Sequence, residues 1–350
     1  MKVILPGRIW DHCMSALFAL ALFIFGLIGA PAFAADHVKI AAFQSTFTNF
    51  PIYVAADLKL FQKHNIDPEI IYGTGVQLTN MVVSGAADFG GFAVAHGITL
   101  VSQRQDVRLL VLNQTRPPFN LIVRNDLALP NLKAPYPAMI RDLKGLKLGI
   151  SNPGADTDTT LRYLLRDAGL DPQKDVRLVP IGDPSTQVGA VKNRTVDGTI
   201  AFEPIQTEAV LALKIAKPVL DLQGGQGPEI FRDYAYNGIF ARQSFLDKNP
   251  QAARNVVAAI VEAEEIINDP AQIERVLQVA KNNMSGIDAA ALRQFIEQYR
   301  GIFTPVANEK AIANVNEFVK AEHLITSAIP YDQVVATAFM PKTFNAPKSK

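Results

Sequence analysis

The residues best suited to binding chemistry lie where an apolar segment, residues 146–150, gives way to the stretch SNPGADTDTT at positions 151–160. The apolar segment predicts a strand, the Pro-Gly pair a turn, and the hydroxyl and acidic residues the start of a helix. A helix start carries free N–H groups and a partial positive charge, so it can bind an oxyanion or another polar group. The candidate ligand-binding residues of this stretch are Asn152, Gly154, Ala155, Asp156 and Thr157. The alternative is an ordinary helix cap provided by Asp156 or Thr157.

A matching helix start is predicted at residues 73–77, GTGVQ, after an apolar strand at 69–72. Thr74 would supply a hydroxyl, Gly75 a close backbone approach and Gln77 an amide. Simple strand-to-helix turn chemistry is the alternative. The longer glycine fingerprint of dinucleotide-binding proteins is absent from this segment, so the pattern does not indicate a nucleotide site.

Aromatic and small residues at two further strand ends could surround the apolar part of a small ligand. They come from the FTNF loop and from the glycine-rich strand that follows the second helix. The candidates are Phe47, Asn49, Phe50, Gly91 and Phe92. Packing inside the protein is an equal alternative for Phe50 and the favoured one for Phe92.

Four more polar residues complete the candidate set: Asn113, Arg116, Glu203 and Tyr236. Arg116 is the basic group best matched to an anionic head, although a solvated charge beside a hinge is its favoured alternative. Glu203 either caps its own helix or accepts from a ligand, and Tyr236 either closes a cleft edge or packs at a hinge. Because Glu203 and two acids of the 151–160 stretch surround the predicted site, an amine, amide or polyol fits better than a strong anion.

Other kinds of site have little support in the sequence. The histidines after residue 34 are scattered and have no metal-ligand spacing, and no nucleophile motif of the G-x-S-x-G type occurs. The only cysteine is Cys13, in the N-terminal segment discussed below. We therefore expect no metal, no cofactor and no catalytic residues.

Strands alternate with helices from residue 38 to residue 112, which predicts an α/β fold with mainly parallel sheets. The order of strand, glycine-containing loop, helix, turn and Asp-initiated strand then occurs a second time, so we expect two similar lobes. Extended apolar runs at 119–124 and 236–241 are interpreted as two segments that cross between them. After the second crossing the chain is almost entirely helical. Helix starts are predicted at Pro250, Asp288 and Asn308.

The first 34 residues are typical of a secretory signal peptide. A weakly basic start is followed by an apolar stretch at 16–28 and by the small-residue site AFA at 32–34, so we predict cleavage before Ala35. An uncleaved anchor is the alternative.

Removal of this segment changes the charge balance of the chain. It carries Lys2, Arg8 and Asp11, and its loss leaves 32 basic and 32 acidic residues, a formal charge of zero. That balance gives no reason to expect binding to nucleic acid or to a charged membrane surface. Since Cys13 is removed too, the mature chain would contain no disulfide.

Three segments in order carry a family resemblance: PIYVAADLKLF at 51–61, SGAADFG at 84–90 and DLKGLKLGI at 142–150. They resemble the periplasmic solute-binding proteins of ABC importers, in the branch that handles nitrate, taurine, aliphatic sulfonates and pyrimidine precursors of thiamine. The likeness extends over nearly all of the mature chain, but it does not identify the ligand.

The resemblance implies a type II-like periplasmic-binding-protein fold, with two α/β lobes, two crossover segments, a helical C-terminal part and the ligand in the interlobe cleft. We place lobe one at 35–122 plus 238–340, lobe two at 123–237 and a flexible tail at 341–350. In such a lobe, ligands lie beyond the carboxyl ends of the strands, where both predicted helix starts occur.

The function implied by the resemblance is that of an exported, monomeric, periplasmic protein without enzymatic activity. It would capture a small polar molecule, such as a sulfonate, taurine, nitrate or a pyrimidine, and deliver it to an ABC permease of the inner membrane with its ATPase. We expect no nucleic-acid partner and no stable membrane insertion after cleavage. Two alternatives stay open. One is a pyrimidine-synthase-like enzyme on the same fold, although such relatives have a Cys-rich signature that is missing here. The other is a periplasmic sensor for a signalling partner.

Overall fold

The structure is a computed structural model that describes residues 35–346 except 183, 204 and 285–286. The predicted signal peptide and the last four residues of the predicted tail lie outside the described residues. No helix in the described part of the chain combines the length and apolar character needed to span a membrane.

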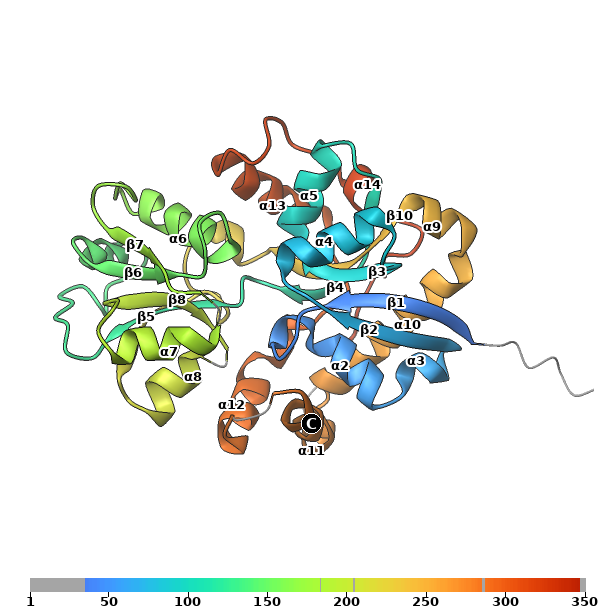
Figure 1. The fold of residues 1–350 in the computed structure, drawn as a ribbon, viewed down its shortest axis with the longest axis horizontal. Coiled ribbons are helices and arrows are strands. Elements are labelled where there is room, and N and C mark those ends of the chain that lie inside the picture. The colour runs from blue at the N-terminus through green and yellow to red at the C-terminus, as the bar shows by residue number, and fades with distance from the viewer. Residues whose placement is uncertain (1–34, 183, 204, 285–286, 347–350) are drawn as a thin grey trace, which may run out of the picture. The chain divides into compact units, whose positions relative to one another are not determined.

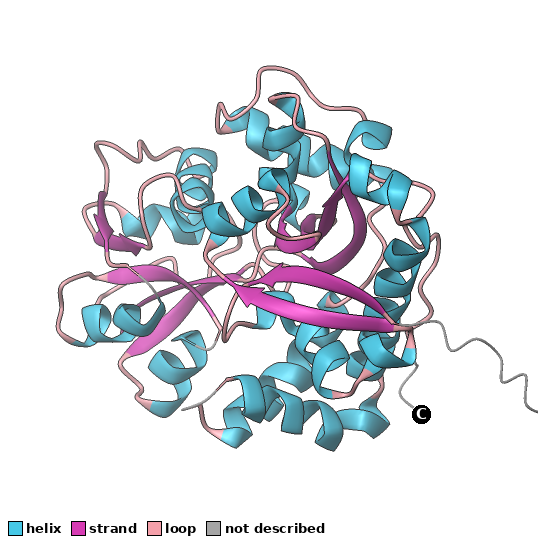
Figure 2. Cartoon of the chain, turned by 45° about the vertical axis from the view of Figure 1, so that its right-hand side comes forward, coloured by secondary structure: helices cyan, strands magenta, loops and turns pink. Residues whose placement is uncertain are grey.

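The described residues form two five-stranded sheets, flanked by helices (Figures 1 and 2). The strands of the first sheet are β1 (Asp36–Ala42), β2 (Ile66–Tyr72), β3 (Phe89–Ala93), β4 (Val107–Thr115) and β10 (Ala235–Arg242). Those of the second sheet are β5 (Phe119–Arg124), β6 (Lys147–Ile150), β7 (Arg177–Pro180), β8 (Gly198–Phe202) and β9 (Ala216–Asp221). The strand orders are β2-β1-β3-β10-β4 and β7-β6-β8-β5-β9.

The two sheets share one pattern. β1 pairs in parallel with β2 and β3, whereas β10 is antiparallel to both β3 and β4. In the second sheet, β6 pairs in parallel with β7 and β8, and β5 is antiparallel to both β8 and β9. Four strands of each sheet therefore run in one direction and one crossing strand runs against them. The α/β class, the mainly parallel sheets and the two similar lobes are confirmed.

Helices pack around both sheets. Around the first sheet these are α2 (Phe50–Asp57), α3 (Leu60–Lys63), α4 (Gly75–Ser84), α5 (Val94–Ser102), α9 (Gln243–Lys248), α10 (Pro250–Asn268), α11 (Ile273–Asn283), α12 (Ala289–Tyr299), α13 (Glu309–Ala321) and α14 (Tyr331–Val334). Around the second they are α6 (Asp156–Asp167), α7 (Pro184–Lys192) and α8 (Ile205–Thr207). The shorter helical segments are η1 (Phe47–Asn49), η2 (Ala138–Leu143), η3 (Glu208–Ala212), η4 (Glu229–Phe231), η5 (Pro270–Gln272) and η6 (Arg300–Ile302).

The predicted helix starts have the expected local chemistry. Pro250 is the first residue of α10, where the missing N–H has no intrahelical partner to lose. The side chain of Asp288 accepts from backbone N–H groups of α12, and that of Asn308 does the same for α13. The helical C-terminal part is confirmed.

The chain passes between the sheets at two short segments. It leaves the first sheet after Thr115 and enters the second at Phe119, so the crossing precedes position 122, where the sequence placed the division. It returns after Asp221 and re-enters the first sheet at Ala235, again before the predicted position 237. The predicted divisions fall inside β5 and β10 because each is one continuous apolar strand with no internal signal for a change of sheet.

Close packing fixes the first lobe. The rings of Phe92 and Phe240 stack with centroids 4.4 Å apart between the sheet and α5. A Cβ atom on Gly97 would lie 2.3 Å from the Phe240 ring, so only glycine allows α5 to approach the sheet this closely. This packing sets the position of the α5 start, where His96 lies.

Candidate functional site

The two predicted helix starts lie at the strand ends of their lobes. α4 begins at Gly75, three residues after β2, and α6 begins at Asp156, six residues after β6. Because β10 and β5 run against their neighbours, the chain crosses from the carboxyl edge of one sheet to the carboxyl edge of the other. The two edges with their helix starts are therefore joined directly by the crossing segments.

His96 and Asp156 connect the two helix starts. A Cβ atom on Gly75 would lie 3.6 Å from Cε1 of His96, and Nε2 of His96 lies 3.3 Å from Oδ1 of Asp156. The hydroxyl of Tyr236, near the start of β10, donates to Oδ2 of Asp156 over 3.2 Å. We call Asp156 with His96 and Tyr236 the Asp156 interlobe contact. One imidazole ring thus separates the start of α4 from the first residue of α6.

His96 and Asp156 each shift the pKa of the other. The Asp156 carboxylate raises the pKa of His96 above its usual value, against the effect of burial. Burial favours the neutral form of Asp156, but His96 and Tyr236 outweigh it and hold the pKa of this carboxyl below its usual value. Burial and the nearby Asp156 raise the pKa of Tyr236. The contact therefore holds an ionised carboxylate between the lobes.

The other polar groups at the α6 start serve the local turn. Oδ2 of Asp158 accepts from the N–H of Gly154 over 2.8 Å, and Oγ1 of Thr157 accepts from the N–H of Ser151 over 3.0 Å. Gly154 has a φ of 78°, which a residue with a side chain rarely adopts. The carbonyl of the exposed Asn152 accepts from the N–H of Ala155. The N-cap residue of α6 is Ala155, which makes no side-chain cap hydrogen bond, so neither Thr157 nor Asp156 caps the helix. Thr157 holds the preceding turn instead, and Asp156 extends away from that turn toward His96.

The polar groups at the α4 start hydrogen-bond to one another. Oε1 of Gln77 accepts from the N–H of Thr74 over 2.9 Å, and the two residues form a capping box. Both side chains are exposed, and the predicted ligand role of Thr74 and Gln77 remains a prediction. Gly75 is the residue of this segment that lies next to His96.

The predicted aromatic wall lies in the core. Phe50 and Phe92 are fully buried. Phe47 stacks on Phe295 of α12 with centroids 3.7 Å apart, and it also contacts Phe50 edge-on. A Cβ atom on Gly91 would lie only 2.5 Å from the amide nitrogen of the Asn49 side chain, so Gly91 accommodates Asn49. These residues therefore pack inside the protein, as the alternative interpretation proposed. The sequence alone could not decide this, because an aromatic residue in a strand or loop has the same sequence pattern whether it lines a core or a cleft.

Three fully buried asparagines form a cluster beside the crossing strands. Asn49 and Asn113 both donate to Oδ1 of Asn237, over 3.0 and 2.9 Å. Asn49 also accepts from the N–H of Phe43. Within the described residues, Nδ2 of Asn237 and Oδ1 of Asn113 have no hydrogen-bond partner. Asn49 and Asn113 are thus brought together, through a residue that the sequence reading did not select.

Glu203 and Arg116 lie at other points of the same region. Glu203, at the end of β8, is only 4% exposed, and its Oε2 accepts from the N–H of Thr207 over 3.1 Å. Burial raises its pKa to about 7, against the hydrogen bond from Thr207. Arg116 has a φ of 47° and donates to the carbonyl of Gln223 over 3.3 Å. Its guanidinium therefore links the two crossing segments by a hydrogen bond.

Several residues of this region are not among the candidates predicted from the sequence. His96 follows the end of β3 as Thr74 follows β2, and this strand-end position was the available signal. Asp221 ends β9 and accepts from the hydroxyl of Tyr299 of α12 over 3.0 Å. No sequence pattern indicated this second contact between the lobes, because its partners are 78 residues apart.

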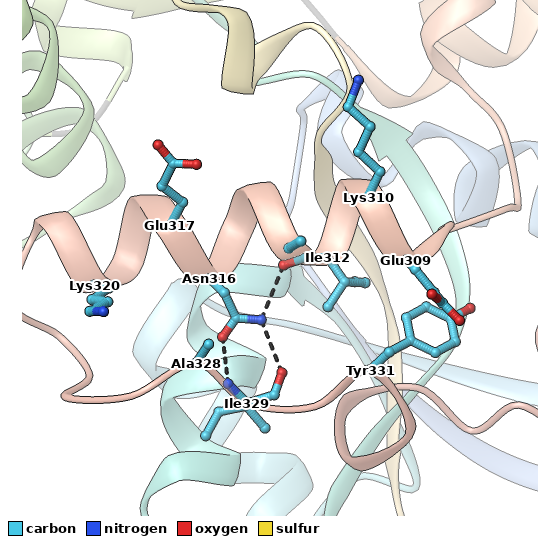
Figure 3. A pocket seen from close by; sticks show the side chains of 10 residues that line it. Glu309, Lys310, Ile312, Asn316, Glu317, Lys320, Ala328, Ile329 and Tyr331 are labelled. Carbon is cyan, nitrogen blue, oxygen red and sulfur yellow. Dashed lines mark hydrogen bonds between the residues drawn. The ribbon is translucent and has the colours of Figure 1, made fainter.

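Two open cavities occur elsewhere. One, of about 660 Å³, lies beside α13, where Asn316 is held by both backbone groups of Ile329 (Figure 3). The other, of about 710 Å³, lies between the loop at 132–139, the end of β9 and Tyr299. Neither cavity is lined by the helix starts. Among the described residues, no group of three or more His, Cys, Asp or Glu is arranged to hold a metal ion.

Comparisons with known proteins agree with this architecture. The sequence profile described as the NMT1-like family matches residues 35–281. The nitrate/nitrite binding protein NrtA of Nostoc sp. is 31% identical over 160 residues, which cover 46% of this chain and 34% of that protein. NrtA of Synechococcus elongatus is 24% identical over 248 residues, which cover 65% and 54% of the two chains. The chain thus spans about a third to a half of the length of these curated relatives.

A solved structure extends the likeness to the whole fold. The periplasmic aliphatic sulphonate binding protein SsuA of Escherichia coli superposes with a TM-score of 0.68 at 16% identity. The match covers 87% of this chain and 99% of that one. At this identity it shows the shared two-lobed fold.

Proposed function

The chain belongs to the NMT1-like family, and on that premise we propose that it is the solute-binding component of an ABC-type importer. It captures a small polar molecule between its two lobes and delivers it to a membrane permease that works with an ATPase. Nitrate and aliphatic sulfonates, for which the relatives are named, are the first solutes to test, together with taurine and pyrimidines.

The observation that carries the proposal is the Asp156 interlobe contact. It brings the start of α6 within reach of His96, which itself lies beside the start of α4. A solute between these walls makes contacts with both lobes only when they are close together, so its binding free energy favours the closed form. A permease can then distinguish loaded from empty protein by the position of the lobes.

We also propose that the protein acts in the periplasm without turnover of its solute. The segment 1–34 directs export and is removed before Ala35, and the mature chain works as a monomer that contacts the permease only transiently. Sequencing the N-terminus of the exported protein tests the cleavage site. A cleavage elsewhere, or retention of the segment, would contradict this part of the proposal.

The binding function is tested with a glycine substitution that places a side chain beside His96. Gly75 does not have a positive φ, and a Cβ atom there meets the neighbouring rings at ordinary contact distances of 3.6 and 3.9 Å. Gly75→Val therefore adds bulk at the α4 start without backbone strain. Gly154 is less suitable, because any side chain at its φ of 78° strains the turn. Gly189→Val is the matched control, since nothing lies within 4 Å of a Cβ atom there.

The measurements are thermal shift and titration calorimetry over a panel of nitrate, sulfonates, taurine, pyrimidines and aromatic acids. A true solute at about a hundred times its dissociation constant adds about 2.7 kcal/mol to the free energy of unfolding. We expect Gly75→Val to weaken its binding by at least about tenfold and Gly189→Val to leave it unchanged. Unchanged binding in Gly75→Val would show that the helix starts do not form the site. Chemical conversion of the solute would contradict a pure binding function.

A further inference from the structure

The start of α6 already holds an anion, and that anion belongs to the protein. Helix starts attract negative groups, and in this lobe the carboxylate of Asp156, the first helical residue, provides one. It points across to the other lobe, where it contacts His96 and Tyr236. An anionic solute at this place would have to displace the Asp156 carboxylate or lie beside it.

The charges of the neighbouring elements do not favour an anion either. Glu203 directly follows β8 and Asp221 ends β9, on the same edge of the second sheet as the α6 start. His96 of α5 is paired with Asp156, and the guanidinium of Arg116 donates to the carbonyl of Gln223. The carboxyl groups of Asp156, Glu203 and Asp221 thus lie at this edge, and the basic groups of His96 and Arg116 are already engaged.

A buried amide provides an independent indication of a polar solute. Gln187 lies in the first turn of α7, is fully buried, and neither its oxygen nor its nitrogen has a hydrogen-bond partner in the described part of the chain. The N-terminus of α7 lies at the strand-end edge, four residues after β7, and helix side chains lean toward the N-terminus of their helix. That edge adjoins the α6 start, since the N–H of Gly182 donates to the carbonyl of Ser151. Leaving such an amide unpaired is costly, and a solute with complementary polar groups would satisfy it.

We infer that Asp156 determines the specificity of the cleft and selects a solute that presents N–H donors, as a protonated amine, amidine or guanidinium does, over nitrate, sulfonate or carboxylate. This inference rests on the proposed solute-binding function and narrows it. The Asp156 carboxylate binds the donor of the solute, and the amide of Gln187 pairs with its polar edge.

The test uses pairs of probes with the same shape and opposite charge. Guanidinium and nitrate are both small, planar and threefold, and benzamidine and benzoate differ only in the group attached to the ring. Binding of each to the purified protein is measured by titration calorimetry at millimolar probe concentration. We expect the cationic member of each pair to bind at least about tenfold more tightly.

Two variants test the residue. Asp156→Asn keeps an oxygen acceptor but removes the charge, and we expect it to reduce the preference for guanidinium over nitrate by at least about tenfold. Asp167→Asn is the matched control, because Asp167 ends the same helix and also accepts from a tyrosine, Tyr136, but far from the helix start. It should leave the preference unchanged.

Several results would overturn the inference. Tighter binding of nitrate or benzoate to the wild-type protein would do so while leaving the solute-binding function intact. An unchanged preference in Asp156→Asn would do so as well, as would absence of binding by both cationic probes. Should Asp156→Asn fail to fold, the wild-type preference between the paired probes still decides the matter. The solute-binding function itself is judged by the broader panel and the Gly75→Val variant.

Discussion

Glu203 gives a quantitative prediction for the pH dependence of stability. The folded protein raises the pKa of this carboxyl from 4.5 to about 7, chiefly through burial. The unfolded chain therefore ionises Glu203 at a lower pH than the folded chain does. Stability is unaffected by this group below about pH 4.5, falls as the pH rises toward 7, and then stays reduced. The full difference of about 2.5 pKa units corresponds to about 3 kcal/mol.

The perturbation is Glu203→Gln, which cannot ionise. The amide oxygen can still accept from the N–H of Thr207, so the local hydrogen bond is kept. We expect the variant to exceed the wild type in free energy of unfolding by about 3 kcal/mol near pH 8.5 and by only about 1 kcal/mol near pH 5. Asp221 also disfavours ionisation of Glu203, and its contribution is part of the expected difference, because Glu203→Gln removes the repulsion between the two carboxylates.

The assay is urea unfolding of both proteins at several pH values between about 5 and 8.5. Glu208→Gln is the matched control, because Glu208 is exposed in the helical segment that follows and should show no pH-dependent difference from the wild type. Parallel stability curves for Glu203→Gln and the wild type across this range would refute the reasoning. They would mean that Glu203 is solvated or paired with a cation when it is ionised.

Three further substitutions test the packing and capping that hold the lobes. Glu264 is fully buried in α10 with neither side-chain oxygen partnered among the described residues. Glu264→Met should therefore raise the free energy of unfolding, measured in urea, by about 1–3 kcal/mol at pH 8 and by less at pH 5. Gly97→Ala should lower stability by about 1–3 kcal/mol in thermal unfolding because its Cβ would meet the Phe240 ring, whereas Gly301→Ala, with nothing nearby, should not. Asn308→Ala should cost about 1 kcal/mol in urea unfolding by removing the α13 cap, and an unchanged midpoint would contradict that role.

Much of the fold could be predicted from the sequence, because it depends on interactions between residues that are close along the chain. Alternating strands and helices, the capping residues Asp288 and Asn308, and the repeated strand-loop-helix order all depend on residues close in sequence. The positions of the two crossings were less readable, since apolar strands continue on either side of them. Pro117 and Pro118 stand in the first crossing and were the available signal, because proline cannot donate to a sheet.

The candidate site was harder to predict because its contacts join distant parts of the chain. The sequence reading identified both helix starts but did not select His96, which lies between them only after α5 packs on the first sheet. It left Phe50 and Phe92 as candidates for either the ligand or the core, with the core favoured for Phe92, and the fold buries both. An aromatic residue after a strand fits either place, and only the packing of the lobe distinguishes them.

The directions of the two acidic side chains at the α6 start, Asp156 and Asp158, follow from the helical repeat alone. Residues two apart on a helix lie about 200° apart around its axis, so Asp156 and Asp158 must face opposite ways. Asp158 shares a face with Leu161 and Leu165 of the core, and it is buried against its own turn. Asp156 is then directed away from that lobe, toward whatever lies across the strand ends. Asp158 therefore stabilises the turn, whereas Asp156, two positions earlier, faces the other lobe. For this reason the inferred charge of the captured solute depends on Asp156 and not on the acidic composition of the stretch.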